Sequence, residues 1–199
     1  MAESSCARHE ATDALIVSIL VPSVPSGVEQ RQVVRETWMA DLLATQRRTT
    51  VCDSLVGQPR PDRRVVCADA RFFIGMVEHH RAAATSHRSN FSALAAEFAL
   101  HGDVVILPVA EGKQQLVAKT AAMLRWAGIH RAYASFVVKV DTDTYVNVPR
   151  FLQHLPSPSA DLVLLGARHG RARCPQGAIY GLSRALLRLI TRGGSSLIT

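Results

Sequence analysis

Two acidic residues that directly follow an apolar run are the clearest candidates for chemistry. Asp141 and Asp143 come after residues 136–140, whose apolar and β-branched composition predicts a buried strand. Side chains two apart in an extended chain point the same way, so both carboxylates can converge on one site at the carboxyl end of this strand. Such hard oxygen ligands suit Mg²⁺ or Mn²⁺, which complete their shell with substrate phosphates. The plainer alternative is a pair of turn-forming aspartates that close the strand.

Three basic side chains lie in segments with helical patterns. Arg31 and Arg35 lie one helical turn apart, near the carboxyl end of the first predicted strand, so both can face the same side. This spacing also fits an ordinary solvated helix surface. Lys119 lies on a later amphipathic segment. Trp38 lies one position short of the next full turn and is expected in the core rather than at a ligand.

The elements that must position these residues alternate along the chain. Apolar runs predict strands at residues 14–21, 72–75, 104–107, 136–140, 162–165 and 178–182. Helical patterns fall at residues 27–46, 89–100, 114–126, 148–155 and 183–190. Strands that alternate with helices predict an α/β fold with a mainly parallel sheet and helices on both faces. Ligands of such sheets bind at the carboxyl ends of the strands, which is where the two aspartates fall.

Length and composition exclude several classes of protein. The 199 residues are 48% hydrophobic and 20% charged, which indicates one globular domain and excludes collagen-like and intrinsically disordered chains. We predict a frayed segment over residues 1–13 and a single domain over residues 14–199. No stretch of about 18 apolar residues is present to span a bilayer. Residues 14–24 are typical of a strand rather than of a signal peptide.

The charge of the chain is basic. Lys and Arg number 23 against 16 Asp and Glu, a net charge of +7. The basic stretch at residues 166–199 lacks the interleaved aromatic side chains of a single-strand-binding surface, so we do not predict nucleic-acid binding.

Six short motifs follow one another along the chain. They are Arg31-x-x-x-Arg35-x-Thr37-Trp38, Phe72-Phe73-Ile74-Gly75, Glu97-x-x-x-His101-Gly102-Asp103-Val104-Val105, Lys119-Thr120 with Trp126, Lys139 to Asn147, and Tyr180-Gly181-Leu182-Ser183. In this order they resemble the β-1,3-galactosyltransferase and N-acetylglucosaminyltransferase family, which also includes Fringe-like enzymes. The likeness runs from about Leu15 to Ile190, and the loosened signatures look similar to those of trypanosomatid members.

The resemblance implies a GT-A-type nucleotide-sugar-binding fold that is incomplete at its C-terminus. It further implies a hexosyltransferase that moves galactose or N-acetylglucosamine from UDP-galactose or UDP-N-acetylglucosamine to a glycan acceptor with inversion. Asp143 becomes the more direct ligand of Mn²⁺ or Mg²⁺, and Asp141 lies nearer the ribose or sugar. The resemblance also implies substrate-binding roles for Arg31 and Arg35, which can face the diphosphate or uracil pocket, and for Lys119, a candidate for contact with the nucleotide. The ion offsets the charge that develops on the leaving UDP.

Two features of the family have no match in these residues. Members carry an N-terminal membrane anchor, and they continue to a Glu-Asp-Val segment to which the catalytic base is attributed. No Asp or Glu follows Ser183, so no catalytic residue is assigned. We therefore expect a chain truncated at both ends that binds the donor but transfers sugar poorly. If turnover is found, Glu78, Glu97 and Asp161 are the first candidates for the base.

Two other functions compete with sugar transfer. The first is a truncated, non-catalytic domain that binds UDP or a partner. The second is a phosphatase of the haloacid dehalogenase kind, whose Asp-x-Asp motif also follows a strand. The phosphatase is disfavoured because its motif belongs on the first strand of the domain, with a long chain after it.

The resemblance also places the protein on the luminal side of the Golgi membrane, held by an anchor outside these residues. Disulfides persist in that compartment. Cys52 and Cys67 flank an Arg- and Pro-rich loop and are the pair we expect. The four cysteines show no zinc-site spacing.

Overall fold

The computed structural model describes residues 15–45, 66–76, 86–158, 161–168 and 175–193. Within them, one six-stranded sheet has the order β3-β2-β1-β4-β6-β5. The strands are β1 (Leu15–Pro22), β2 (Val66–Met76), β3 (Val104–Ala110), β4 (Phe136–Val140), β5 (Leu164–Arg168) and β6 (Pro175–Ser183). Residues 1–14 lie outside this part of the chain, so the frayed segment and the domain boundary stay predictions.

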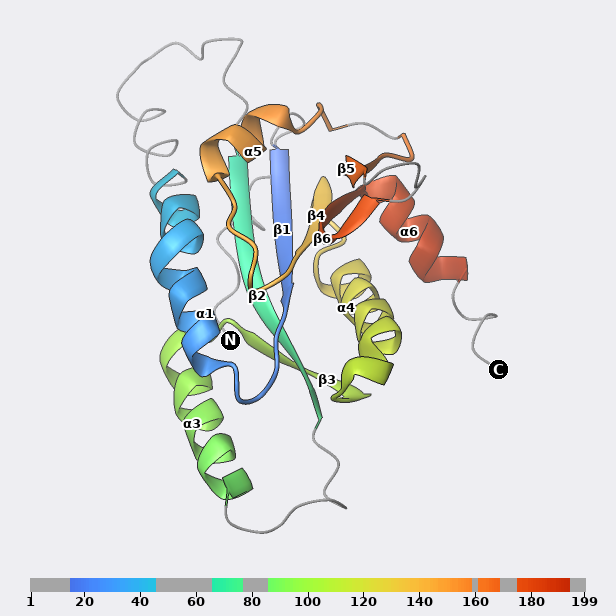
Figure 1. Ribbon diagram of the computed structural model, residues 1–199. Coiled ribbons are helices and arrows are strands. Elements are labelled where there is room, and N and C mark those ends of the chain that lie inside the picture. Colours follow the sequence, from blue (N-terminus) through green and yellow to red (C-terminus); the bar gives the residue numbers. More distant parts are fainter. Residues whose placement is uncertain (1–14, 46–65, 77–85, 159–160, 169–174, 194–199) are drawn as a thin grey trace.

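Helices cover both faces of the sheet (Figure 1). They are α1 (Val28–Val34), which continues through the π-helical turn η2 (Arg35–Met39), α3 (Ser86–His101), α4 (Leu116–His130) after the short 3₁₀ turn η4 (Lys113–Gln115), α5 (Val148–His154) and α6 (Arg184–Gly193). Among the described residues, no helix combines the length and apolarity needed to cross a bilayer. The predicted α/β fold with helices on both faces is confirmed.

β1 lies in the middle of the sheet and separates two apolar clusters. Val17 and Ile19 point into a cluster that includes side chains of α1, α3 and α5. Ile16 and Leu20 point into a second cluster with side chains of α4 and α6. Because successive side chains of a strand face opposite ways, a strand buried on both faces must be apolar at every position, and seven of the eight residues of β1 are buried.

The sheet is parallel on one side of β4 and antiparallel on the other. β1 pairs in parallel with β2 and β4, and β2 pairs in parallel with β3. β6 is antiparallel to both of its neighbours, β4 and β5. Only residues 169–174 connect β5 to β6, and a parallel pair needs a crossover of about a dozen residues or more. The mainly parallel sheet is therefore confirmed, with an antiparallel edge that periodicity did not reveal.

β2 is longer than its apolar run at residues 72–75 predicts. It pairs with β1 from Val66 to Phe73, through the charged residues Asp69 and Arg71. The strand can include the charged Asp69 because Arg131 pairs with it: Arg131 Nε donates to Asp69 Oδ2 over 2.8 Å. The Arg131 guanidinium also lies over the Trp126 ring. A charge in the strand that is matched by a distant partner is invisible to hydropathy.

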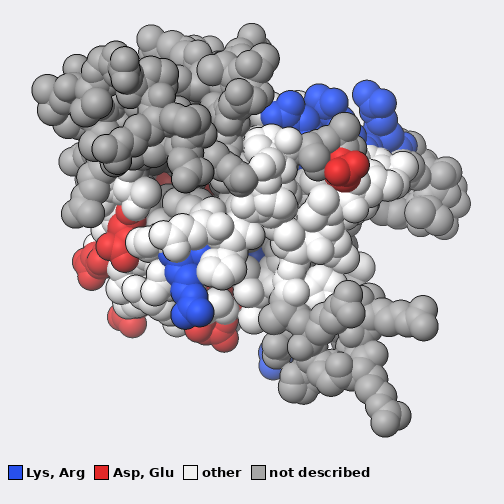
Figure 2. Space-filling view, turned by 90° about the horizontal axis from the view of Figure 1, so that it is seen from above, with Lys and Arg blue, Asp and Glu red and all other residues white. Residues whose placement is uncertain are grey.

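Charged side chains are unevenly spread over the described surface. In Figure 2, most visible acidic side chains lie toward one side of the molecule, and a group of basic ones lies toward the opposite side.

Trp38 lies in the core, as its spacing predicts. It is 1% exposed and packs in the cluster between the sheet and α1, α3 and α5. Its Nε1 finds no hydrogen-bond partner within the described residues, so the ring contributes through packing alone.

Truncation of Trp38 should therefore destabilise the chain strongly. We expect Trp38→Ala to lower the free energy of unfolding by about 3–5 kcal/mol, the usual cost of emptying a large aromatic site. Val33→Ala on the same helix removes a 58% exposed side chain and should cost within about 0.5 kcal/mol. Urea denaturation followed by circular dichroism measures both, and equal losses would contradict a core role for Trp38.

Cys67 is disulfide-bonded in the structure. The other cysteines lie outside the described residues, so the pairing with Cys52 stays a prediction. Peptide mapping of the oxidised protein without reduction should find Cys67 cross-linked to the Cys52 peptide. A cross-link to the peptide of Cys6 or Cys174 would correct the pairing.

Candidate functional site

The carboxyl ends of β1 and β4 meet at one edge of the sheet. Leu20 pairs with Lys139, so Pro22 at the end of β1 and Asp141 after β4 leave the sheet side by side. The chain runs outward from β1 through β2 to β3 in one direction and starts the other half of the sheet at β4. Such a reversal of strand order opens a crevice in which α/β proteins bind ligands. The structure thus brings the predicted aspartates to a ligand-binding edge.

Asp141 and Asp143 lie in a turn, and backbone hydrogen bonds hold the first residue of this turn in place. Asp141 N donates to Ala178 O of β6 over 2.9 Å, and Thr144 N donates to Asp141 O over 3.0 Å. The Asp141 side chain is 36% exposed, and Asp143 is exposed. The turn then enters α5, where the Asn147 side chain accepts from Arg150 N over 3.1 Å and caps the helix. Both carboxylates are accessible to a ligand at this edge.

A divalent ion here would depend on the ligand for part of its shell. Within the described residues, no group of three or more His, Cys, Asp or Glu side chains gathers to hold a metal. Two carboxylates do fit Mg²⁺ or Mn²⁺ when water and phosphate oxygens supply the other positions. The donor set therefore fits an ion shared with a diphosphate better than a cage built by protein alone.

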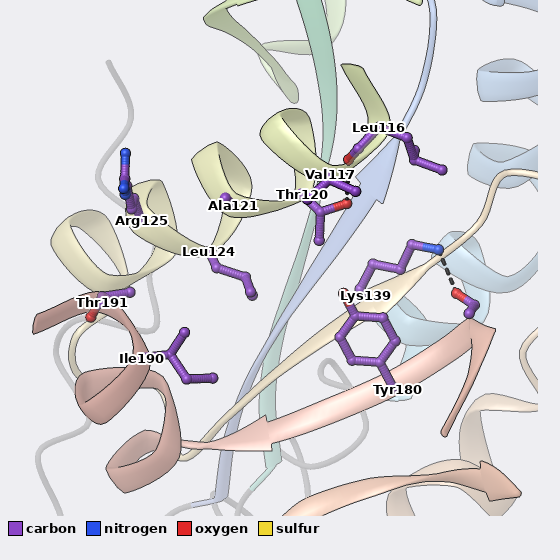
Figure 3. A pocket seen from close by; sticks show the side chains of 11 residues that line it. Leu116, Val117, Thr120, Ala121, Leu124, Arg125, Lys139, Tyr180, Ile190 and Thr191 are labelled. Carbon is purple, nitrogen blue, oxygen red and sulfur yellow. Dashed lines mark hydrogen bonds between the residues drawn. The ribbon is translucent and has the colours of Figure 1, made fainter. Parts of the chain in front are cut away.

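Lys139 is a residue of this site to which the sequence assigned no role. Its ammonium is mostly buried and donates to the Asp141 carboxylate and to Gly177 O, the latter drawn as a dashed line in Figure 3. It also lies 5.9 Å from the ring centroid of Tyr180. Burial, reinforced by the negative charge of Asp141, raises the pKa of Tyr180. These contacts hold one face of Asp141 and leave the rest of the carboxylate exposed.

An apolar cavity of about 520 Å³ adjoins this corner. It lies between α4, β6 and α6, and Figure 3 shows Leu116, Val117, Leu124 and Ile190 around it, with Lys139 and Tyr180 at one end. Its walls are mainly aliphatic, so it can accept an apolar group but offers few polar partners.

Arg31 does not lie on a solvated helix surface. It is 0% exposed, and its Nε and Nη2 donate to the two Glu97 carboxylate oxygens over 2.7 and 2.6 Å. Its Nη1 donates to Ser23 Oγ over 2.9 Å and to Val24 O over 2.6 Å. Protein groups engage the whole guanidinium, and contact between Arg31 and a nucleotide stays a prediction.

Arg35 joins the same buried network one turn later. It forms a bidentate pair with Asp103, with both N···O distances 2.8 Å, and its Nη2 also donates to Glu97 Oε1 over 2.6 Å. The guanidinium lies 4.8 Å from the Phe72 ring centroid, and its side chain is 10% exposed. A direct role for Arg35 in substrate binding stays a prediction, and its visible contacts are with protein groups.

Lys119 is likewise buried, at 3% exposure. Its Nζ lies 2.8 Å from both Glu111 carboxylate oxygens and donates to Ser23 O. Glu111 Oε2 in turn accepts from Gly75 N over 2.7 Å. Contact between Lys119 and a nucleotide likewise stays a prediction. The sequence analysis missed the partner Glu111, because nothing in its sequence context marks it.

The structure removes Glu97 from the candidates for a general base. The carboxylate is 6% exposed and holds both Arg31 and Arg35. Burial alone would raise the pKa of Glu97, but hydrogen bonds and charges from the two arginines outweigh it and hold the pKa below its ordinary value. A carboxylate paired in this way is a poor proton acceptor. Glu78 lies outside the described residues, and Asp161 is exposed.

The sheet order and the acidic corner at a strand-order reversal are consistent with the GT-A-type fold of nucleotide-sugar-dependent glycosyltransferases. Residues 29–163 match the sequence family described as galactosyltransferase. The chain belongs to this family.

Curated relatives carry names of the same kind. Beta-1,3-galactosyltransferase 6 of Mus musculus is 32% identical over 159 residues, 76% of this chain and 38% of the relative. Beta-1,3-galactosyltransferase 4 of Homo sapiens is 29% identical over 77% of this chain and 33% of the relative. UDP-GlcNAc:betaGal beta-1,3-N-acetylglucosaminyltransferase 9 of Bos taurus is 31% identical over 82% of this chain and 40% of the relative. The matched region thus spans between a third and two fifths of each relative.

The paired state of Glu97 predicts a pH-dependent contribution to stability. The folded-state pKa lies below the ordinary value of about 4.3, so the contribution is complete above that value and is lost as the pH falls through the folded-state pKa. At pH 7, Glu97→Gln should cost about 3 kcal/mol, because it leaves the buried Arg31 guanidinium without its negative partner and leaves Arg35 with Asp103 alone. Urea denaturation from pH 7 to pH 3 should show the two proteins converging in acid.

Glu36→Gln provides the control, since Glu36 is exposed and accepts a hydrogen bond from the Gln32 side chain across one turn. It should leave the stability at pH 7 nearly unchanged. A gap between wild type and Glu97→Gln that stays constant down to pH 3 would contradict the ionised state of Glu97.

Proposed function

We propose that this chain is the donor-binding part of a UDP-sugar-dependent hexosyltransferase. The observation that carries the proposal is the corner formed by Asp141 and Asp143 at the carboxyl end of β4, in a chain that belongs to the galactosyltransferase family. A diphosphate placed at this edge meets two carboxylates through a shared ion, next to the loop that follows β1. The reaction would move the hexose to a hydroxyl group of a glycan acceptor with inversion at the anomeric carbon.

The names of the relatives support the donor class. They specify transfer of galactose or N-acetylglucosamine in a β-1,3 linkage. We therefore propose UDP-galactose or UDP-N-acetylglucosamine as the donor and a glycan as the acceptor. On the same basis we propose the luminal side of the Golgi membrane as the location, with an anchor outside these 199 residues.

We propose Mn²⁺ or Mg²⁺ as the ion, held by Asp143 and Asp141. When bound, such an ion acts as a Lewis acid that offsets negative charge on the departing diphosphate. Lys139 steadies the Asp141 carboxylate from the side of β6, and exposed Asp143 is the more direct ligand. We assign no catalytic base, because Glu97 is bound to two arginines and Asp161 lies beside Ser183, at the opposite end of β4 from Asp141.

Metal-linked nucleotide binding tests the proposal. Isothermal titration should show UDP binding in the presence of Mn²⁺ and little binding in EDTA, because the ion connects the carboxylates to the diphosphate. Asp143→Asn should weaken binding by tenfold or more, about 1.4 kcal/mol, and by more than Asp141→Asn does.

Asp41→Asn is the matched control, because it removes an exposed carboxylate on the helix that continues from α1. It should leave the affinity for UDP unchanged. Equal affinity with Mn²⁺ and in EDTA would rule out the shared ion. UDP binding without transfer to any galactoside, xyloside or N-acetylhexosamine would favour the alternative of a non-catalytic UDP-binding domain.

A further inference from the structure

Ser23 is the first residue of the loop after β1, and its backbone N–H, its side-chain oxygen and its carbonyl all form hydrogen bonds. Ser23 N donates to Phe73 O of β2 over 2.8 Å. Its Oγ accepts from Arg31 Nη1 over 2.9 Å, and its carbonyl accepts from Lys119 Nζ. Ser23 is only 6% exposed. No rotation of this residue is possible without breaking at least one of these bonds.

Two buried ion pairs reach Ser23 from helices on opposite faces of the sheet. Arg31 comes from α1 and is paired with Glu97 of α3, whereas Lys119 comes from α4 and is paired with Glu111. The chain positions are far apart, since 96 residues separate Lys119 from Ser23 and 66 separate Arg31 from Glu97. The loop is thus the point at which the two helical layers are connected at this edge.

The following residues are fixed by the same contacts. Val24 O accepts from Arg31 Nη1 over 2.6 Å and from Gly27 N over 2.9 Å, which closes a turn over residues 24–27. A Cβ on Gly27 would come within 3.1 Å of Ser23 Oγ and 3.2 Å of Val24 O. A side chain here would therefore press on Ser23 and Val24, which would have to shift to accommodate it. Val24 itself is 44% exposed and is presented to solvent by a rigid backbone.

A gain in folding stability alone does not explain why these two ion pairs are buried. Burying an ion pair costs desolvation energy that its attraction often only balances, so apolar residues of similar volume commonly do as well. What an ion pair adds is fixed geometry, because each charge must face its partner and each remaining proton needs an acceptor. Here those remaining protons go to Ser23 and Val24, which lie beside Asp141 at the edge where the donor is proposed to bind.

We propose that the pairs Arg31–Glu97 and Lys119–Glu111 preorganise residues 23–26 as the wall of the donor site that receives the nucleoside half of the UDP-sugar. All four are positioning residues that act through Ser23 and Val24 and do not touch the ligand. This rests on the proposed function, since it needs a nucleotide at this edge. Holding the loop in its binding conformation removes the ordering cost that a free loop would add to each binding event.

The experiment compares two ligands and four variants. UDP and inorganic pyrophosphate, each with Mn²⁺, are titrated at a temperature at which every protein is folded by circular dichroism. Lys119→Met removes one of the two ion pairs that hold the loop, and Gly27→Ala disturbs the loop while leaving all charges in place. Both should weaken UDP binding about tenfold and change pyrophosphate binding by less than about twofold, because only the nucleoside half meets the wall.

A third variant separates positioning from stability. Lys119→Met with Glu111→Gln removes both charges of the pair, so it should recover melting temperature relative to Lys119→Met alone. The carbonyl of Ser23 still lacks its donor, so UDP binding should stay weak. Leu94→Ala is the control for general destabilisation, since Leu94 is a buried core residue of α3, the helix that carries Glu97. It should lower the melting temperature and leave both affinities unchanged.

The outcomes distinguish the two proposals. If wild type binds UDP with Mn²⁺ and Lys119→Met and Gly27→Ala bind it equally well, the positioning role is wrong and the proposed function stands. The same conclusion follows if UDP affinity tracks melting temperature across all variants, including Leu94→Ala, or if pyrophosphate binding falls as much as UDP binding. Absence of UDP binding by wild type overturns the proposed function and this inference with it.

Discussion

The buried carboxylate of Glu97 forms ion pairs with both Arg31 and Arg35, and the packing of α1 against α3 depends on these contacts. Through Arg31 it connects α3 to α1 and to the loop after β1, and through Arg35 it reaches Asp103 at the start of β3. Each buried guanidinium needs a negative partner, and a lone one would be far more costly than the pair. The positions of α1, α3 and Asp103 relative to one another are thus fixed by charge as well as by apolar packing.

Lys139, on β4, is another buried cation that needs a negative partner. Its ammonium is buried on the strand that delivers Asp141, and it finds its second acceptor, Gly177 O, because β6 lies beside β4. Had the chain continued as a parallel sheet, a crossover would have been needed and the Gly177 carbonyl would not face this lysine. The antiparallel strand β6 therefore affects the candidate metal ligands, because it holds Lys139, which in turn orients Asp141. Asp143 stays open to solvent.

These contacts divide the candidate residues into two kinds. Asp141 and Asp143 are accessible and can meet a ligand, whereas Arg31 and Lys119 are buried and meet protein groups. The alternative of a solvated helix surface is wrong for Arg31, which is 0% exposed, whereas its contact with a nucleotide stays a prediction. In the structure the charges of Arg31 and Lys119 are buried against protein groups that include the backbone after β1. Both kinds of residue lie within the region that matches the galactosyltransferase family.

The sequence by itself determined the order of strands and helices, the core position of Trp38 and the delivery of Asp141 and Asp143 to a strand end. These are local properties, because hydrophobic periodicity and a carboxylate after an apolar run are read within a dozen residues. Only the tertiary structure decided that β2 continues through Asp69 and Arg71, that β6 runs antiparallel, and which face of α1 and α4 is charged yet buried. Arg31 and Lys119 look like surface residues in sequence because Glu97 is 66 positions from Arg31, and Ser23, which accepts from both, is 96 positions from Lys119. The burial of a charge depends on a partner that folding brings to it, and no local pattern records that partner.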